Sequence, residues 1–260
     1  MALIPDARAF LSTASSVPPS GPGGYAALQQ GIAAVEAHRF SDALRYFDNA
    51  INQISEPRML AGAYANRGTA NCWLGRTEQA KADYDRAIRT WPRDPEIYHA
   101  AGFEMFRAGR DAEAAAYFAL GLKAARKNAV FLNSVAWFLA TSPAKSLRNG
   151  TEAIRYAQEA CNMSHWKTPN YIDTLAAAEA EAGDFSSAIK HEQLFLASRK
   201  LMPEVRIRAE QRLRKFEKHQ PFHEHPERKL SGHAQKGEQA RRLLAPQTRC
   251  LCYVAALLAR

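Results

Sequence analysis

Ser142-Pro-Ala-Lys145 is a segment whose residue types could support catalysis. A serine three residues before a lysine is the spacing of penicillin-binding enzymes, in which the serine is the nucleophile. Those enzymes also need Ser-Asp-Asn and Lys-Thr-Gly motifs, and this sequence has neither. The segment lies in a polar stretch between expected helices, so we interpret it as a turn and expect no catalytic residue.

Two short pairs of metal-ligand residues occur towards the end of the chain, His223-Glu-His225 and Cys250-Leu-Cys252. Neither pair has the spacing of a known zinc site, and neither lies in a segment that could fix tetrahedral geometry. The segment Gly21-Pro-Gly-Gly24 lacks the lysine and the strand-to-helix setting of a phosphate-binding loop. We therefore expect no metal site and no cofactor, and we predict that the protein is not an enzyme.

Positive charge is concentrated in the last part of this 260-residue chain. The formal net charge is +9, and residues from 201 onward contain 13 Lys/Arg against 6 Asp/Glu. Contact of this region with the phosphates of RNA or DNA is an alternative function. Interleaved glutamates and a shortage of aromatic residues for base stacking argue against it. The basic residues on the expected helix are Arg206, Arg208, Arg212, Arg214, Lys215 and Lys218.

Cysteine usage and the first residues bear on the compartment. The four cysteines are scattered rather than spaced as a disulfide framework. Met1 to Phe10 includes Pro5 and Asp6 where a secretory signal would be apolar. The longest apolar run, from Leu251 to Ala259, is about half the length that spans a bilayer. We expect a cytoplasmic protein without a membrane span.

The chain repeats itself with a period of 34 residues. Small residues are needed where two helices of a hairpin cross, and aromatic residues fill the space between hairpins. Gly75 and Gly109 fall where a left-handed turn would join two helices. The period therefore predicts stacked helical hairpins. The residues that recur are Tyr64, Gly68, Gly75, Ala80, Tyr84 and Ala87, matched by Tyr98, Gly102, Gly109, Ala114, Phe118 and Gly121.

These residues resemble the signature of the tetratricopeptide repeat (TPR), a 34-residue pair of antiparallel helices, with Pro92 at its end. The second repeat departs from the signature at Arg67 and Asn71. The resemblance implies an all-α, right-handed α-solenoid of about five TPR-like helical hairpins with a C-terminal capping helix. The stretch from Asn133 to Gly183 also looks like a repeat variant common in bacterial proteins.

The resemblance divides the chain into an array and two flanking regions. A flexible leader is expected at 1–23, because its Pro, Gly and Ser residues bury little apolar surface. An amphipathic capping helix is expected at 203–219 and a basic, disordered tail at 220–260. The fourth repeat has a longer turn, from Thr141 to Gly150. The repeats are expected at 24–57, 61–94, 95–128, 129–168 and 169–202.

In TPR arrays the first helix of each hairpin lines a concave groove, so the resemblance implies that inward positions bind a peptide of a partner protein. Aromatic residues there are suited to anchor a peptide, although they could equally pack against adjacent helices or a tail folded into the groove. The protein is thus expected to be a non-enzymatic scaffold or adaptor. The peptide-binding residues assigned in this way are Asn66, Thr69, His99, Phe103, Phe106, Asn133 and Trp137.

One known use of such a groove is a clamp for the C-terminal carboxylate of chaperones, built from Lys, Asn and Arg residues. Only Asn66 occupies a matching position. The other four positions hold Leu28, Ile32, Glu96 and Ala100, which supply no charge-assisted donor for a carboxylate. We therefore do not expect binding of chaperone tails.

Overall fold

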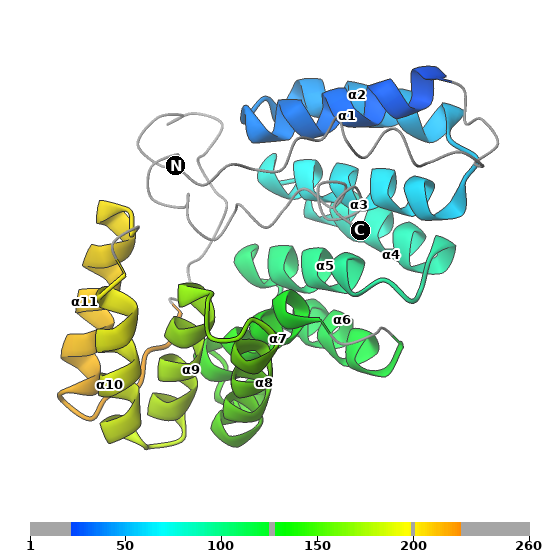
Figure 1. Cartoon of the computed structure of the whole chain (residues 1–260). Coiled ribbons are helices and arrows are strands. Elements are labelled where there is room, and N and C mark those ends of the chain that lie inside the picture. Colours follow the sequence, from blue (N-terminus) through cyan, green and yellow to red (C-terminus); the bar gives the residue numbers. More distant parts are fainter. Residues whose placement is uncertain (1–21, 125–127, 199–200, 225–260) are drawn as a thin grey trace.

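The computed structural model describes residues 22–124, 128–198 and 201–224, and within these ranges the chain forms eleven α-helices and a short 3-10 helix. The first ten α-helices pack as five consecutive hairpins, and the last packs against α10 (Figure 1). The hairpins are α1 (Pro22–Glu36) with α2 (Phe40–Gln53), α3 (Pro57–Trp73) with α4 (Thr77–Thr90), α5 (Pro95–Arg107) with α6 (Asp111–Ala124), α7 (Ala129–Thr141) with α8 (Gly150–Met163), and α9 (Pro169–Glu181) with α10 (Phe185–Leu196). The remaining helices are the 3-10 turn Lys145–Leu147 and α11 (Pro203–Phe216).

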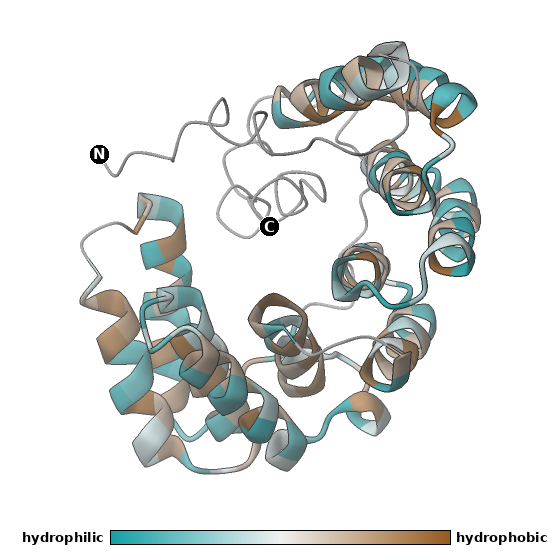
Figure 2. Ribbon diagram, turned by 45° about the vertical axis from the view of Figure 1, so that its right-hand side comes forward, coloured by the Kyte–Doolittle hydropathy of each residue, from teal (hydrophilic) through white to brown (hydrophobic). Residues whose placement is uncertain are grey.

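The hairpins form a stack in which each contacts its neighbours in the sequence. The first helices, α1, α3, α5, α7 and α9, contact one another in that order and form one continuous layer. Figure 2 shows the stack bending into an open curve, with the second helices on its outer side. The predicted all-α solenoid of helical hairpins is confirmed. The leader up to residue 21 and the tail from residue 225 onward lie outside the described residues.

The repeated glycines make room for aromatic rings inside each hairpin. A Cβ atom on Gly102 of α5 would lie 2.5 Å from the Phe118 ring of α6, closer than carbon atoms can pack. Gly68 faces Tyr84 in the same way in the preceding hairpin. Phe118 also approaches Phe138 of the next hairpin, with ring centroids 5.2 Å apart. The same aromatic position therefore fills space within a hairpin and between hairpins.

Capping residues set where the helices begin. The Glu56 carboxylate accepts hydrogen bonds from the backbone N–H groups of Arg58 and Met59, and Pro57 occupies the first turn of α3. Helix α3 consequently begins before position 61, where the repeat signature places the start of the second repeat. Gly75 and Gly109 have φ of 75° and 74° and make the left-handed turns expected of them.

The two departures of the second repeat from the TPR signature have a shared structural cause. Arg67 of α3 donates from Nε and Nη2 to the carboxylate of Asp83 on α4, at 3.0 and 2.6 Å. Its Nη1 donates to Asp48 of α2 at 2.7 Å. The Asn71 amide donates to Asp83 at 3.1 Å. Arg67 and Asn71 thus satisfy a carboxylate that is 3% exposed.

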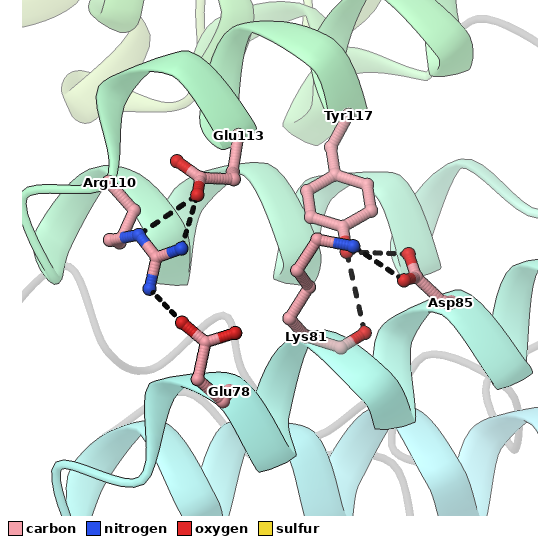
Figure 3. A network of polar contacts seen from close by, with 6 residues as sticks. All are labelled: Glu78, Lys81, Asp85, Arg110, Glu113 and Tyr117. Carbon is pink, nitrogen blue, oxygen red and sulfur yellow. Dashed lines mark hydrogen bonds and ion pairs between the residues drawn. The ribbon is translucent and has the colours of Figure 1, made fainter.

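A second polar network joins α4 to α6 on the outer side of the array (Figure 3). Tyr117 donates to Asp85 at 2.8 Å, and Lys81 pairs with the same carboxylate at 2.7 Å. Burial and the bond to Asp85 raise the pKa of the Tyr117 phenol, so it remains a donor. Arg110, the residue before α6, pairs with Glu113 of α6 and with Glu78 of α4. These contacts fix the spacing between the second and third hairpins.

Candidate functional site

A pocket of about 290 Å³ lies on the layer of first helices, in the second half of the array. It is enclosed by three successive hairpins together with α11 and the segment that follows α11. Pockets that hold small ligands are typically about 300–1,000 Å³, so this one suits a few side chains. Its lining residues are His99, Phe103, Val130, Asn133, Ser134, Trp137, Asn170, Tyr171, Asp173, Thr174, Phe195, Val205, Arg208, Arg212, Phe222 and Glu224.

His99 of α5 lines this pocket and carries a buried hydrogen-bond acceptor. Its Nδ1 lies 2.7 Å from the Ser134 hydroxyl of α7, which is also 3.1 Å from the carbonyl oxygen of Val130. A carbonyl can only accept, so Ser134 donates to Val130 and accepts the Nδ1–H of His99. The other ring nitrogen, Nε2, is then unprotonated, and it has no hydrogen-bond partner among the described residues.

Burial keeps the His99 ring neutral. The side chain is 5% exposed, and burial lowers its pKa from 6.5 to about 4. The ring stacks on Phe103, with centroids 5.7 Å apart. Asn133, one helix away, also carries a buried side-chain oxygen, Oδ1, that lacks a partner in the described part of the chain. Two residues that line the pocket therefore carry buried, unpaired acceptors, next to the aromatic ring of Phe103.

Two aromatic rings and a guanidinium form the opposite wall. The rings of Trp137 and Phe222 lie with centroids 6.1 Å apart. The Arg212 guanidinium lies 5.8 Å from the centroid of each ring. At this distance a cation is attracted by the face of an aromatic ring. Arg212 of α11 thereby links the last helix to α7.

Arg212 is also the centre of a buried charge cluster. It is 6% exposed, and its Nη2 pairs with Asp173 of α9 and with Glu192 of α10, the latter at 3.2 Å. Burial and the adjacent Asp173 raise the pKa of Glu192 to about 9, so Glu192 is protonated near neutral pH. The cluster then consists of one cation and one anion. Arg212 Nε has no hydrogen-bond partner within the described ranges.

Two polar contacts, one to Glu181 and one to Thr141, hold the segment after α11 against the array. The carboxylate of Glu181 on α9 lies 2.6 Å from His223 Nε2 and 2.8 Å from Arg148 Nε. The backbone N–H of Glu224 donates to the carbonyl of Thr141 at 2.7 Å. Residues 220–224, expected within a disordered tail, are therefore placed against the array, because His223 and Phe222 both find partners there.

The sequence-predicted binding residues separate into two groups. His99, Phe103, Asn133 and Trp137 line the pocket. The remaining three are buried elsewhere: the Asn66 amide donates to Gly62, Thr69 contacts the Tyr84 hydroxyl at 3.1 Å, and Phe106 packs edge-on against Phe138. The structure does not bring these three to the pocket.

The pocket residues that the sequence prediction missed come mainly from α11 and the segment after it. Arg208 and Arg212 were assigned to a basic surface helix, whereas both line the pocket. Their spacing of four residues on an amphipathic helix places them on one face, but the repeat signature ends before α11 and gives no register for that face. Phe222 lies beyond the expected capping helix, and nothing in its local sequence marks it as a contact of Trp137.

The other residues considered for chemistry lie apart from one another. Ser142 is buried, and Lys145 is exposed on the 3-10 turn. Cys72 and Cys161 are buried free thiols, and burial raises the pKa of Cys161 to about 11, so this thiol is protonated at neutral pH. Cys250, Cys252 and His225 lie outside the described residues.

None of the helices described here is both long and apolar enough to cross a membrane.

Comparison with known proteins places the fold. No model of a known protein family matches the sequence, and no significant match exists among curated proteins. Solved structures do match. PilW, described as a widely conserved type IV pilus biogenesis factor, is 16% identical with a TM-score of 0.60, over 76% of this chain and 88% of that protein. TTC0263, described as a thermophilic TPR protein in Thermus thermophilus, is 16% identical with a TM-score of 0.56, over 72% and 97%.

A third similar structure belongs to a larger assembly. A chain of the APC/C hetero-tetramer Cut9–Hcn1 is 17% identical with a TM-score of 0.54, over 73% of this chain and 35% of that one. Identities this low reflect a shared fold rather than shared partners. The five stacked hairpins, the glycine and aromatic packing positions and these structural matches agree. The chain therefore has the fold of the tetratricopeptide-repeat proteins.

Proposed function

We propose that this protein is a non-enzymatic interaction module that binds a peptide segment of a partner protein in the pocket enclosed by α5, α7, α9 and α11. The observation that carries the proposal is the unpaired Nε2 of His99 and Oδ1 of Asn133 in one pocket. Buried polar atoms without partners are costly, and the backbone N–H groups of a bound peptide would satisfy acceptors of this kind.

The apolar part of the same pocket would supply affinity. Phe103, Trp137 and Phe222 provide aromatic surface from three separate parts of the chain. Burial of such surface contributes about 25 cal/mol per Å², and the ordering of a peptide opposes it, so we expect a micromolar dissociation constant. A scaffold or adaptor role would follow from this binding, and we propose the cytoplasm as the place of that role.

The alternative of nucleic-acid binding by the basic helix has less support. Arg206 donates to the carbonyls of Leu196 and Ser198, and Arg212 is buried against Asp173. Two of the cations that would contact phosphates are thus engaged within the protein. Arg214, Lys215 and Lys218 remain exposed, and interactions made by these alone would weaken steeply with salt.

Site-specific crosslinking in the full chain tests the proposal. A photoreactive phenylalanine analogue is introduced at Asn133 in the pocket, or at Gln193, an exposed residue of α10, as the matched control. Crosslinked proteins are identified, purified and tested for direct binding to the unmodified chain. Support requires a partner that crosslinks from position 133 but not from 193, and that loses at least tenfold in affinity to an Asn133→Arg variant.

The salt dependence distinguishes the two functions. Binding in the pocket should change little between 50 and 300 mM salt, since apolar contacts dominate it. The proposal would be overturned if nucleic acid were captured from both positions. Its affinity for the chain would then be lost at 300 mM salt and unaffected by Asn133→Arg.

A further inference from the structure

The pocket contains a guanidinium that forms no ion pair with the residues that the structure describes. Arg208 of α11 is half-buried and lines the pocket one helical turn before Arg212. It forms no ion pair with any carboxylate of the described residues, and its one hydrogen bond is a long contact of 3.4 Å to the Glu204 carbonyl. Burial, followed by repulsion from Arg212, lowers its pKa. An unpaired, partly desolvated cation is a costly feature to retain.

The carboxylates near Arg208 act on it without a contact as close as an ion pair in the described part of the chain. Asp173 is committed to Arg212, and Glu192 is protonated near neutral pH. Glu224, Asp173 and Glu204 attract Arg208, which partly offsets its repulsion by Arg212. Two cationic side chains, Arg208 and Arg212, therefore line one pocket, and Arg208 has no ion pair among the described residues. Both groups are suited to an anionic acceptor.

The remaining lining complements a peptide rather than an inorganic anion. His99 Nε2 and Asn133 Oδ1 need donors, which phosphate dianions and free carboxylates lack. A peptide supplies backbone N–H donors and a side-chain carboxylate together. Trp137 and Phe222 form an apolar wall in the same pocket, where a neighbouring side chain of the peptide can pack.

We infer that the pocket recognises an acidic side chain, Asp or Glu, next to an apolar residue in the bound segment, with Arg208 contacting the carboxylate. This inference rests on the proposed function and adds the chemistry of the ligand. The carboxylate belongs to a side chain within the segment. The site proposed here differs from the clamp for chaperone C-termini, because Arg208 lies on α11, outside the repeats.

A random heptapeptide library fused through its C-terminus to a display protein provides the test, because such peptides have no free terminal carboxylate. The full chain selects from the library in parallel with Arg208→Gln and Arg214→Gln. Arg214 is the matched control, an exposed arginine on the same helix. Selected peptides and their Glu→Gln or Asp→Asn counterparts are then measured by fluorescence polarisation.

We expect enrichment of an acidic residue beside an aromatic or aliphatic one with the wild-type chain and with Arg214→Gln. Replacement of the acidic residue should weaken binding at least tenfold, and this difference should disappear in Arg208→Gln and return in part in Arg208→Lys. Circular dichroism confirms that each variant retains its helices.

Two results would overturn the inference, and they differ in what they say of the proposed function. In the first result, the selected peptides bind the wild-type chain and lose affinity to Asn133→Arg, but they show no preference for an acidic residue. The pocket would then remain a peptide site, and Arg208 would have no role in recognition. Selected peptides whose affinity is unchanged by Asn133→Arg and by Arg208→Gln would contradict both the peptide site in this pocket and the role of Arg208.

Discussion

Arg67 of α3 donates hydrogen bonds from two nitrogens to Asp83 of α4, at 3.0 and 2.6 Å, and from its third nitrogen to Asp48 of α2. One side chain thus joins two consecutive hairpins. Hydrogen bonding to Asp83 is the main reason that the pKa of the Arg67 guanidinium is raised. TPR signatures have an apolar residue at this position. In this chain the position holds an arginine, whose charge stabilises the contact between the two hairpins.

Replacement of Arg67 by leucine, which restores the signature, should destabilise the protein. Asp83 would remain buried without its main partner, at a cost of about 2–3 kcal/mol in unfolding free energy. Urea denaturation of Arg67→Leu, Asp83→Ala and the double variant measures the coupling. The double variant should cost at least about 1 kcal/mol less than the sum of the single variants, whereas simple additivity would show that the pair is dispensable.

The buried His99 should make the protein sensitive to acid. The folded state holds its pKa at about 4, while the unfolded chain takes up a proton near pH 6.5. Between these values only the unfolded state is protonated, so stability falls as pH falls, by up to about 3 kcal/mol. Denaturation midpoints at pH 7, 6, 5 and 4 test this. A His99→Phe variant should lose this part of the pH dependence, and an unchanged slope would exclude His99 as its source.

Glu192 should act in the opposite direction. Its folded pKa is raised to about 9, so between pH 4.5 and 9 the folded state retains a proton that the unfolded state has released. Stability from this group is therefore present at low pH and lost as pH rises. Glu192→Gln should increase the melting temperature more at pH 8 than at pH 5. The exposed Glu217→Gln is the control, and an equal effect at both pH values would contradict the assignment.

Gly102 should tolerate no side chain while Phe118 faces it. The Cβ of Gly102→Ala would lie 2.5 Å from the ring, and the resulting displacement should cost about 1–3 kcal/mol. The test is thermal denaturation of Gly102→Ala with and without Phe118→Leu. The smaller side chain should relieve part of the clash, so the alanine should cost less in the Phe118→Leu background than in the wild type.

The contact between His223 and Glu181 should hold the last described segment on the array. Hydrogen exchange at the backbone amide of Glu224, which donates to Thr141, reports on this segment directly. His223→Ala should accelerate that exchange by about tenfold, equivalent to loss of one charge-assisted hydrogen bond. Lys218→Ala, an exposed change on the same segment, should leave it unaltered.

The repeat fold could be predicted from the sequence because its packing is pairwise and local. Gly102 with Phe118 and Gly68 with Tyr84 recur at one period, so their residue types reveal their contacts. Arg67 could not be interpreted in that way, since its partner Asp83 does not belong to the signature. The start of α3 cannot be read from the period for a related reason: Glu56 and Pro57 determine it by capping, four residues before the repeat boundary at 61.

The pocket was only partly predictable. His99 and Trp137 lie at inward positions of first helices, and the repeat register identifies them. Thr69 and Phe106 are inward by the same rule, but Thr69 contacts Tyr84 within its own hairpin and Phe106 packs against Phe138 of the next hairpin. Arg212 lies outside the repeats, and its burial depends on Asp173, 39 residues earlier. A periodic pattern contains no information on such a pairing.

The pairing of Arg212 with Asp173 also has a consequence for the order in which the chain is made. A ribosome adds about 5–20 residues per second, so the 39 residues that separate the two take roughly 2–8 seconds. In the last part of this interval, after Leu196 has been added, the fifth hairpin is complete but lacks the helix that covers it, so Asp173 and Trp137 are without Arg212. The nascent array is exposed on its inner side until α11 emerges, and the last residues described here complete the pocket.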